Sequence, residues 1–296
     1  MKILITGASG FLGKHIVDEA IKQGHEVLCL KHSEIDNCQE NVNTFAPEIL
    51  VHCAWGGVSA ADRNNPELQA ANIEMSKKVV MLYPFKQIIG AGSQDEYGNI
   101  NEVVDEEHPL KPISEYAKAK ISFCNWLKEY AESHNIEWQW IRIFNMYGTG
   151  QALNWLIPAI IAKCKNGEKT MDTTKGEQQY AYLNADDFGR AMVSVFGAKG
   201  KCGIYNISSS NPLPLHDIFM MIKELTHSDI EFNFGAMPYR QGQSMMICGN
   251  SEKFINLFGM FETTSITQGI KQLLEGGGKI VVFLFNSCCD SNRLAA

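Results

Sequence analysis

A glycine-rich segment at residues 6–13, TGASGFLG, constrains the fold of this chain more than any other stretch. It follows a short apolar run, residues 3–5, that predicts a buried strand, and it precedes apolar residues at helical spacing from Phe11 to Ile21. Strand, glycine turn and helix in this order begin a βαβ unit, in which the helix N-terminus offers free N–H groups to phosphates. The segment therefore predicts a site for the diphosphate of a dinucleotide.

The three glycines of this segment have different expected roles. Gly7 permits a tight turn after the strand, Gly10 lets a diphosphate approach because it has no Cβ, and Gly13 lets the helix pack closely on the sheet. The predicted dinucleotide contacts in the segment are Gly7, Gly10, Phe11, Leu12 and Gly13. The alternative is an ordinary glycine turn of an α/β protein that binds nothing.

The end of the second predicted strand, residues 25–30, bears on the choice of cofactor. An acidic residue there suits the ribose of NAD, whereas a basic residue suits the 2′-phosphate of NADP. Here the strand is followed by Lys31, and the first acid is Glu34. We interpret Lys31 as favouring NADP, with NAD as the alternative. A surface lysine without a cofactor role is also common after a strand.

Further along, strands alternate with helices. Strands are expected at 49–53, 86–91 and 138–144, and helices at 37–45 (capped by Asp36), 66–82 and 112–135. This alternation predicts an α/β fold with a doubly wound parallel sheet, a Rossmann domain, mainly in residues 1–150. A smaller α/β substrate lobe is expected mainly in residues 151–275, with strands near 180–183, 204–207 and 230–234 and helices near 154–165, 185–197, 214–226 and 265–275.

Composition narrows the functional classes. The chain has 296 residues, is 45% hydrophobic and carries a net charge of −7 without a long basic run, so we expect neither nucleic acid nor an anionic membrane as a partner. No apolar stretch approaches the roughly 20 residues of a membrane span, and residues 1–30 already form a folding unit, so we expect no secretory signal. The nine cysteines form no Cys-x-x-Cys pair, so we expect a reduced, cytoplasmic protein without a metal site.

The tail from Gly276 differs from the rest of the chain. A Gly-Gly-Gly run is followed by the apolar segment 279–285 and a polar end that contains cysteines. This pattern is typical of an edge strand or of a cloning or frameshift remnant, and we assign it no function.

The residues with catalytic potential are Tyr116, Lys120 and Ser93. Tyr116 and Lys120 are spaced i, i+4 on a predicted helix, which places them on one face. A lysine beside a tyrosine lowers the pKa of the phenol, so the pair is able to transfer protons near neutral pH. Ser93 follows the strand at 86–91, at the carboxyl edge where parallel sheets bind ligands. Taken alone, a Tyr-x-x-x-Lys pair is common by chance.

At this point the chain resembles the extended short-chain dehydrogenase/reductases, the NAD-dependent epimerase/dehydratase family that acts on nucleotide sugars. The matching motifs span about residues 1–275 and lie at 6–13, 51–54, 93–98, 109–112, 142–148, 157–158, 176–178 and 186–187, together with Ser114, Tyr116 and Lys120. The resemblance implies a dinucleotide cofactor, a nucleotide-sugar substrate and a homodimer built on the helices at 66–82 and 112–135.

The resemblance also implies roles for single residues. Tyr116 would be the acid/base. Lys120 would adjust the pKa of Tyr116 and bind the ribose of the cofactor, and the Ser93 hydroxyl would bind the same substrate oxygen as Tyr116. The implied cofactor contacts also include Lys31, Cys53, Ala54, Tyr116 and Lys120. The implied substrate contacts are Ser93, Asp95, Asn145 and Arg240, although Arg240 has an ordinary surface salt bridge as its alternative and Asn145 a role in a strand-end turn.

Two segments depart from the family pattern. Tyr180 and Ala181 stand where many members have an Arg-Asp pair whose arginine contacts the nucleotide, so the identity of the base stays open. The loop at 53–55 contains Trp55, where small apolar residues are usual.

Family members reduce a 4-keto sugar, epimerise at C4 or C5, or dehydrate to a 4-keto-6-deoxy sugar. Dehydration needs further acid/base groups after the serine, typically an Asp-Glu or Ser-Glu pair, where this chain has Gln94 and Asp95. Gln94 is unable to protonate a leaving hydroxyl, whereas Asp95 could serve although it is shorter than Glu, so dehydration is weakened but stays open. Lys31 favours exchangeable NADPH and so net reduction. Overall similarity is greatest to reductases of 4-keto-6-deoxyhexoses, the group that forms CDP-abequose and dTDP-fucose for surface polysaccharide such as lipopolysaccharide. The alternatives are an NAD-dependent epimerase or dehydratase and a non-catalytic NAD(P)-binding sensor.

Overall fold

The computed structural model describes residues 1–59 and 61–276. The tail that we expect to be an edge strand or a remnant therefore lies, after Gly276, outside the described residues. The fold is built on a central parallel sheet of six strands, in the order β10-β6-β4-β3-β1-β2. Its strands are β1 (Lys2–Thr6), β2 (Glu26–Leu30), β3 (Ile49–His52), β4 (Gln87–Ser93), β6 (Glu137–Ile143) and β10 (Gly203–Ile207).

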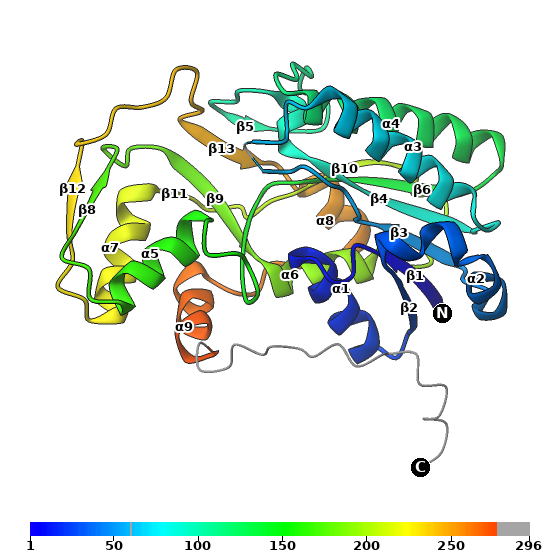
Figure 1. The fold of residues 1–296 in the computed structure, drawn as a ribbon, viewed down its shortest axis with the longest axis horizontal. Helices are drawn as coiled ribbons and strands as arrows, with labels where there is room; N and C mark the ends of the chain where they lie inside the picture. Colours follow the sequence, from blue (N-terminus) through cyan, green and yellow to red (C-terminus); the bar gives the residue numbers. More distant parts are fainter. Residues whose placement is uncertain (60, 277–296) are drawn as a thin grey trace, which may run out of the picture.

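Helices cover both faces of the central sheet (Figure 1). On one face lie α1 (Phe11–Lys22), α6 (Ala185–Ser194) and α8 (Glu252–Phe258), and on the other α3 (Pro66–Met81) and α4 (Glu115–Ser133). Alternate residues of β1 explain this, because Ile3 and Ile5 join the core under α1 and α6 while Leu4 joins the core under α3 and α4. The predicted doubly wound parallel sheet is confirmed.

A second group of elements lies beside the carboxyl edge of the sheet. The strands are β5 (Val103–Val104), β7 (Asn145–Tyr147), β8 (Thr170–Thr173), β9 (Gln179–Asn184), β11 (Pro212–Pro214), β12 (Glu231–Phe234) and β13 (Met246–Gly249). The helices are α5 (Leu156–Lys165), α7 (Leu215–Thr226) and α9 (Ile266–Gly276), and they share a core of their own. This group corresponds in part to the smaller lobe that the sequence predicts for residues 151–275, and its role in binding substrate stays a prediction.

The chain crosses repeatedly between the two parts. Strand β10 and helix α6 come from the range expected for the second lobe, yet β10 pairs with β6 in the central sheet and α6 packs on α1. Conversely, β5 pairs with β13 in the second group. The boundary at residue 150 therefore stays a prediction, and it describes only where most residues of each part lie.

The segment after β2 differs from our expectation. Asp36 does not cap the next helix, because residues 32–37 form a 3₁₀ helix, η1 (His32–Asn37). The following α2 (Gln39–Phe45) begins after Cys38 instead. Because Asp36 lies inside the 3₁₀ helix, its side chain is not at the N-cap of α2, where Cys38 stands.

The glycine turn after β1 is packed too tightly for side chains at two positions. Gly7 has φ +71°, and a Cβ there would lie 2.7 Å from the Ala54 nitrogen. A Cβ on Gly13 would lie 2.1 Å from the Gly7 carbonyl oxygen, whereas one on Gly10 would lie 3.1 Å from it. The close approach of α1 to the turn thus depends on Gly13, as its position in the motif predicts.

Replacing Gly13 by alanine is therefore expected to lower the free energy of unfolding by about 1–3 kcal/mol, because backbone atoms must move to admit the methyl group. Urea unfolding without cofactor measures the effect. Gly10→Ala is the control, with a smaller expected loss because its Cβ makes a longer contact. Equal stability of the Gly13→Ala variant and the wild type would contradict the close packing of α1 on the turn.

Candidate functional site

A cavity of about 470 Å³ lies at the carboxyl edge of the central sheet. The predicted cofactor contacts that line it are Gly7, Gly10, Phe11, Leu12, Gly13, Cys53, Tyr116 and Lys120. Three predicted substrate contacts, Ser93, Asp95 and Asn145, line it as well. The cavity wall does not include Ala54, Lys31 or Arg240. The fold thus gathers most of the predicted site into one space, because the glycine turn, Ser93 and Asn145 all follow or end strands that finish at the same edge.

Tyr116 lies in the first turn of α4, whose N-cap Ser114 accepts a hydrogen bond from Ala117 N–H. Its own N–H donates to the Arg63 carbonyl at 2.8 Å, and its side chain is 8% exposed. Burial raises the pKa of the phenol above its usual value, while a hydrogen bond with the Ser93 side chain opposes this rise. The structure therefore brings Ser93 and Tyr116 together as predicted, but the expected lowering of the tyrosine pKa by Lys120 is wrong.

Lys120 explains why the expected effect is absent. Its Nζ lies 5.8 Å from the centre of the Tyr116 ring, donates to the Ala91 carbonyl at 2.8 Å and lies 3.8 Å from the centre of the Trp55 ring. Burial disfavours the ammonium and lowers the pKa of Lys120 to about 7. Trp55, which marks a departure from the family pattern, thus supplies a cation–π contact to this lysine.

A buried carboxylate fixes the backbone at Ser93. Ser93 ends β4 and begins the 3₁₀ helix η2 (Gln94–Tyr97), and its N–H donates to Glu96 Oε1 at 2.8 Å. Glu96 also accepts from Trp140 Nε1 at 3.0 Å and from Arg142 Nε at 2.8 Å. Glu96 and Arg142 lie inside sequence motifs, but their roles as partners were missed because a motif does not show which side chains meet.

Sequence reasoning also missed Arg63, which lies in the loop between β3 and α3. Its guanidinium forms an ion pair with the Asp95 carboxylate and lies 5.2 Å from the centre of the Tyr116 ring. Burial raises the pKa of Asp95, and the charge of Arg63 opposes the rise. Loop residues carry no periodic signal, so nothing in the sequence marked Arg63.

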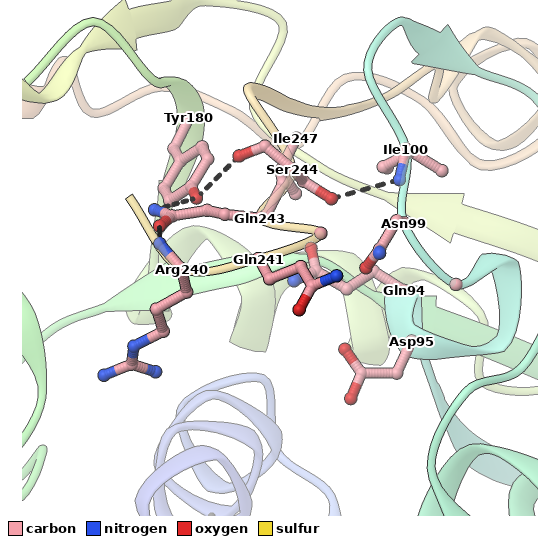
Figure 2. A pocket seen from close by; sticks show the side chains of 12 residues that line it. Gln94, Asp95, Asn99, Ile100, Tyr180, Arg240, Gln241, Gln243, Ser244 and Ile247 are labelled. Carbon is pink, nitrogen blue, oxygen red and sulfur yellow. Dashed lines mark hydrogen bonds between the residues drawn. The ribbon is translucent and has the colours of Figure 1, made fainter. Parts of the chain in front are cut away.

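A second hollow of about 360 Å³ adjoins the first through the shared residues Gln94 and Asp95. Arg240 lines this hollow (Figure 2), where its backbone N–H donates to Gln243 Oε1 at 3.1 Å. Tyr180, at one of the two departures noted from the sequence, donates its hydroxyl hydrogen to the Ser244 carbonyl at 2.9 Å. The predicted substrate contact Arg240 is therefore beside the main cavity rather than in it.

The end of β2 is less basic than its sequence indicates. The turn of η1 brings Glu34 back, so that its carboxylate accepts from the Lys31 N–H at 3.0 Å and lies 4.0 Å from Lys31 Nζ. An acid and a base thus stand together at this position, and NAD stays an alternative to NADP.

Two properties of the described residues bear on other functions. Residues 1–59 and 61–276 hold no group of three or more His, Cys, Asp or Glu side chains placed to bind a metal ion. Within the same part of the chain, each helix is too short or too polar to cross a membrane.

The Glu96–Arg142 pair gives a prediction about stability. Their side chains are 0% and 3% exposed, so Glu96→Gln would leave the Arg142 charge buried without its counter-ion. The expected loss is about 3–5 kcal/mol in the free energy of unfolding by urea. Glu74→Gln, which breaks an exposed pair with Lys77, is the control and should change stability by less than about 1 kcal/mol. Similar losses for both variants would show that the burial of the Glu96–Arg142 pair does not set its effect on stability.

Lys120 gives a prediction about pH. Between its folded pKa of about 7 and its ordinary value of 10.5, the unfolded chain holds a proton that the folded protein has released. Lys120 therefore makes the free energy of unfolding rise with pH in this window, by at most about 1.4 kcal/mol per pH unit.

Unfolding measured at pH 7 and pH 9 should show this rise in the wild type and in Lys118→Met, whose side chain is exposed on the same helix. Lys120→Met should show a smaller rise. A rise in Lys120→Met as large as in the wild type would contradict the assignment.

Comparisons with known proteins agree with this geometry. The model of the NAD dependent epimerase/dehydratase family matches residues 3–208. CDP-abequose synthase of Salmonella muenchen is 26% identical, over 93% of this chain and 97% of that protein. A putative UDP-glucose 4-epimerase of Methanocaldococcus jannaschii is 27% identical, over 92% of this chain and 97% of that protein.

The fold has a close structural counterpart in the UDP-glucose 4-epimerase of Thermotoga maritima, solved with UDP-glucose. The TM-score is 0.84 at 22% sequence identity, and the match covers 94% of this chain and 100% of the other. Because the family model spans more than half of the chain, from the glycine turn to the end of β10, the comparison settles the family. The chain belongs to the NAD-dependent epimerase/dehydratase family.

Proposed function

We propose that the protein is an NADPH-dependent reductase of a nucleotide-linked 4-keto-6-deoxyhexose, in the formation of sugars for surface polysaccharide. The observation that carries the proposal is that Ser93, Tyr116 and Lys120 line one cavity together with the glycine turn. Similarity to CDP-abequose synthase along nearly the whole chain supports the substrate class.

The residues present fit a dinucleotide. Gly7 and Gly13 let the turn and α1 pack closely, and Gly10 leaves the N-terminus of α1 without a side chain at the N-cap, where N–H groups and the helix dipole favour a diphosphate. Bound there, NADPH would supply a hydride to the keto-sugar. Lys31 supports NADP, whereas the nearby Glu34 keeps NAD as the alternative.

The chain's own groups act on the oxygen of the ketone. Tyr116 donates its phenolic proton as the carbonyl oxygen becomes an alkoxide, and Ser93 donates a hydrogen bond to the same oxygen. A phenol whose pKa is raised by burial stays protonated at neutral pH, which is the form that reduction requires. Oxidation of a sugar hydroxyl, the first step of 4-epimerisation, instead requires a phenolate as base.

The second candidate is an NAD-dependent 4-epimerase, because the Methanocaldococcus jannaschii relative is at least as similar in identity. Dehydration is less favoured, since Gln94 carries no acidic proton and Asp95 is paired with Arg63. We also propose a homodimer through α3 and α4.

The experiment follows the reduced nicotinamide by its absorbance after NADPH or NADH and a nucleotide 4-keto-6-deoxyhexose are added. We expect NADPH to be preferred and oxidised in a one-to-one ratio with the sugar. If the protein instead holds NAD tightly and interconverts sugars while the amount of reduced nicotinamide stays constant, it is an epimerase.

Tyr116→Phe is expected to lower turnover at least about 100-fold while NADPH affinity stays within about twofold, since only the proton donor is lost. Tyr130→Phe, on the same helix but outside the cavity wall, is the matched control and should keep wild-type turnover. Wild-type turnover by Tyr116→Phe would remove this tyrosine from the mechanism.

A further inference from the structure

Unpaired polar atoms concentrate in the larger cavity. Among residues 1–59 and 61–276, six buried side-chain nitrogen or oxygen atoms have no hydrogen-bond partner, and four belong to residues that line this cavity. These four atoms are Arg63 Nε, Gln94 Oε1, Asn145 Nδ2 and Gln151 Oε1. A buried polar atom without a partner is unfavourable by about 1–3 kcal/mol, so such atoms gathered around one cavity indicate groups that a ligand satisfies.

Two of these atoms form a matched pair. Gln94 Nε2 donates to Asn145 Oδ1 at 3.3 Å, and this hydrogen bond links η2 to β7 in the lining of the cavity. The link leaves Gln94 Oε1 as an acceptor and Asn145 Nδ2 as a donor, both buried and unpaired. If both amides were turned over, one donor and one acceptor would still be left. The pair complements a hydroxyl group, which donates one hydrogen bond and accepts another.

The place of the pair is close to the reacting centre. Gln94 follows Ser93 directly in the chain, and its side chain also lines the adjoining hollow that contains Arg240 (Figure 2). A hydroxyl bound between Gln94 and Asn145 would therefore belong to the sugar ring, near the carbon on which Ser93 and Tyr116 act.

We propose that Gln94 and Asn145 together bind one hydroxyl group of the sugar, which makes Gln94 a specificity-determining residue. The inference rests on the proposed function for the presence of a nucleotide sugar in this cavity. A sugar that lacks this hydroxyl leaves both amides unpaired, so the pair selects against the corresponding deoxy sugar.

The experiment is a double-mutant cycle between the protein and the sugar. Binding is measured by calorimetry with NADPH present, using the UDP-, CDP-, dTDP- and GDP-linked 6-deoxyglucoses and then the 2- and 3-deoxy analogues of the one that binds most tightly, because the proposed 4-keto-6-deoxy substrate carries hydroxyls only at C2 and C3. In the wild type, one deoxy analogue should bind at least about tenfold more weakly than its parent. In Gln94→Met, which keeps the length of the side chain, the same analogue should lose less than about twofold.

The matched control is Gln151→Met, because Gln151 also lines the cavity with an unpaired amide oxygen but makes its hydrogen bond to the Met146 carbonyl. This variant should keep the tenfold loss for that deoxy analogue. Gln94→Ala repeats the measurement, and NADPH affinity verifies that each variant is folded.

Two results would overturn the inference alone. One is that each deoxy analogue loses as much affinity in Gln94→Met as in the wild type. The other is that Gln151→Met reduces the loss of affinity for the deoxy analogue as much as Gln94→Met does. Failure of the wild type to bind any of the four nucleotide sugars would overturn the proposed function, and the inference with it. Selective coupling at one hydroxyl supports the inference whichever reaction follows.

Discussion

The carboxylate of Glu96 is the interaction on which the arrangement of the site depends. It lies fully buried at the carboxyl edge of the sheet, where it accepts hydrogen bonds from the Ser93 N–H, Trp140 Nε1 and Arg142 Nε. Arg142 in turn donates to the Tyr97 hydroxyl, which donates to Asn206 on β10. The ends of β4, β6 and β10 are thereby joined. Because a buried ion pair is stable only when its remaining polar atoms are satisfied, the turn that carries Ser93 has little freedom to move.

Much of the fold could be predicted from local sequence. The glycine turn between a strand and a helix predicted the nucleotide-binding architecture, and the order of Ser93, Tyr116 and Lys120 predicted residues that the structure gathers around one cavity. A short strand near 204–207 was also expected, where β10 spans Gly203–Ile207, but its partner was not. Apolar residues in a strand show that it is buried without showing beside which strand, so the return of β10 to β6 needed the three-dimensional structure.

The properties that sequence reasoning missed arise from burial and from loops. The pair of Tyr116 and Lys120 suggested a phenol of low pKa, yet both groups lose solvent, so the pKa of the phenol rises and that of the ammonium falls. Arg63 approaches Tyr116 from a loop, where no periodicity predicts direction. Glu34 reaches Lys31 only because residues 32–37 turn as a 3₁₀ helix. Each depends on a local path of the backbone that residue types alone do not determine.

The repeated crossing of the chain between its two parts has a consequence for how ligands enter. With β10 and α6 built into the central sheet and β5 built into the second group, more than one connection would have to bend for the parts to swing open. Rigid-body hinge opening of the kind seen in two-lobed binding proteins is thus a poor description of this molecule. Any opening of the cavity must therefore come from segments outside the strands and helices that join the two parts.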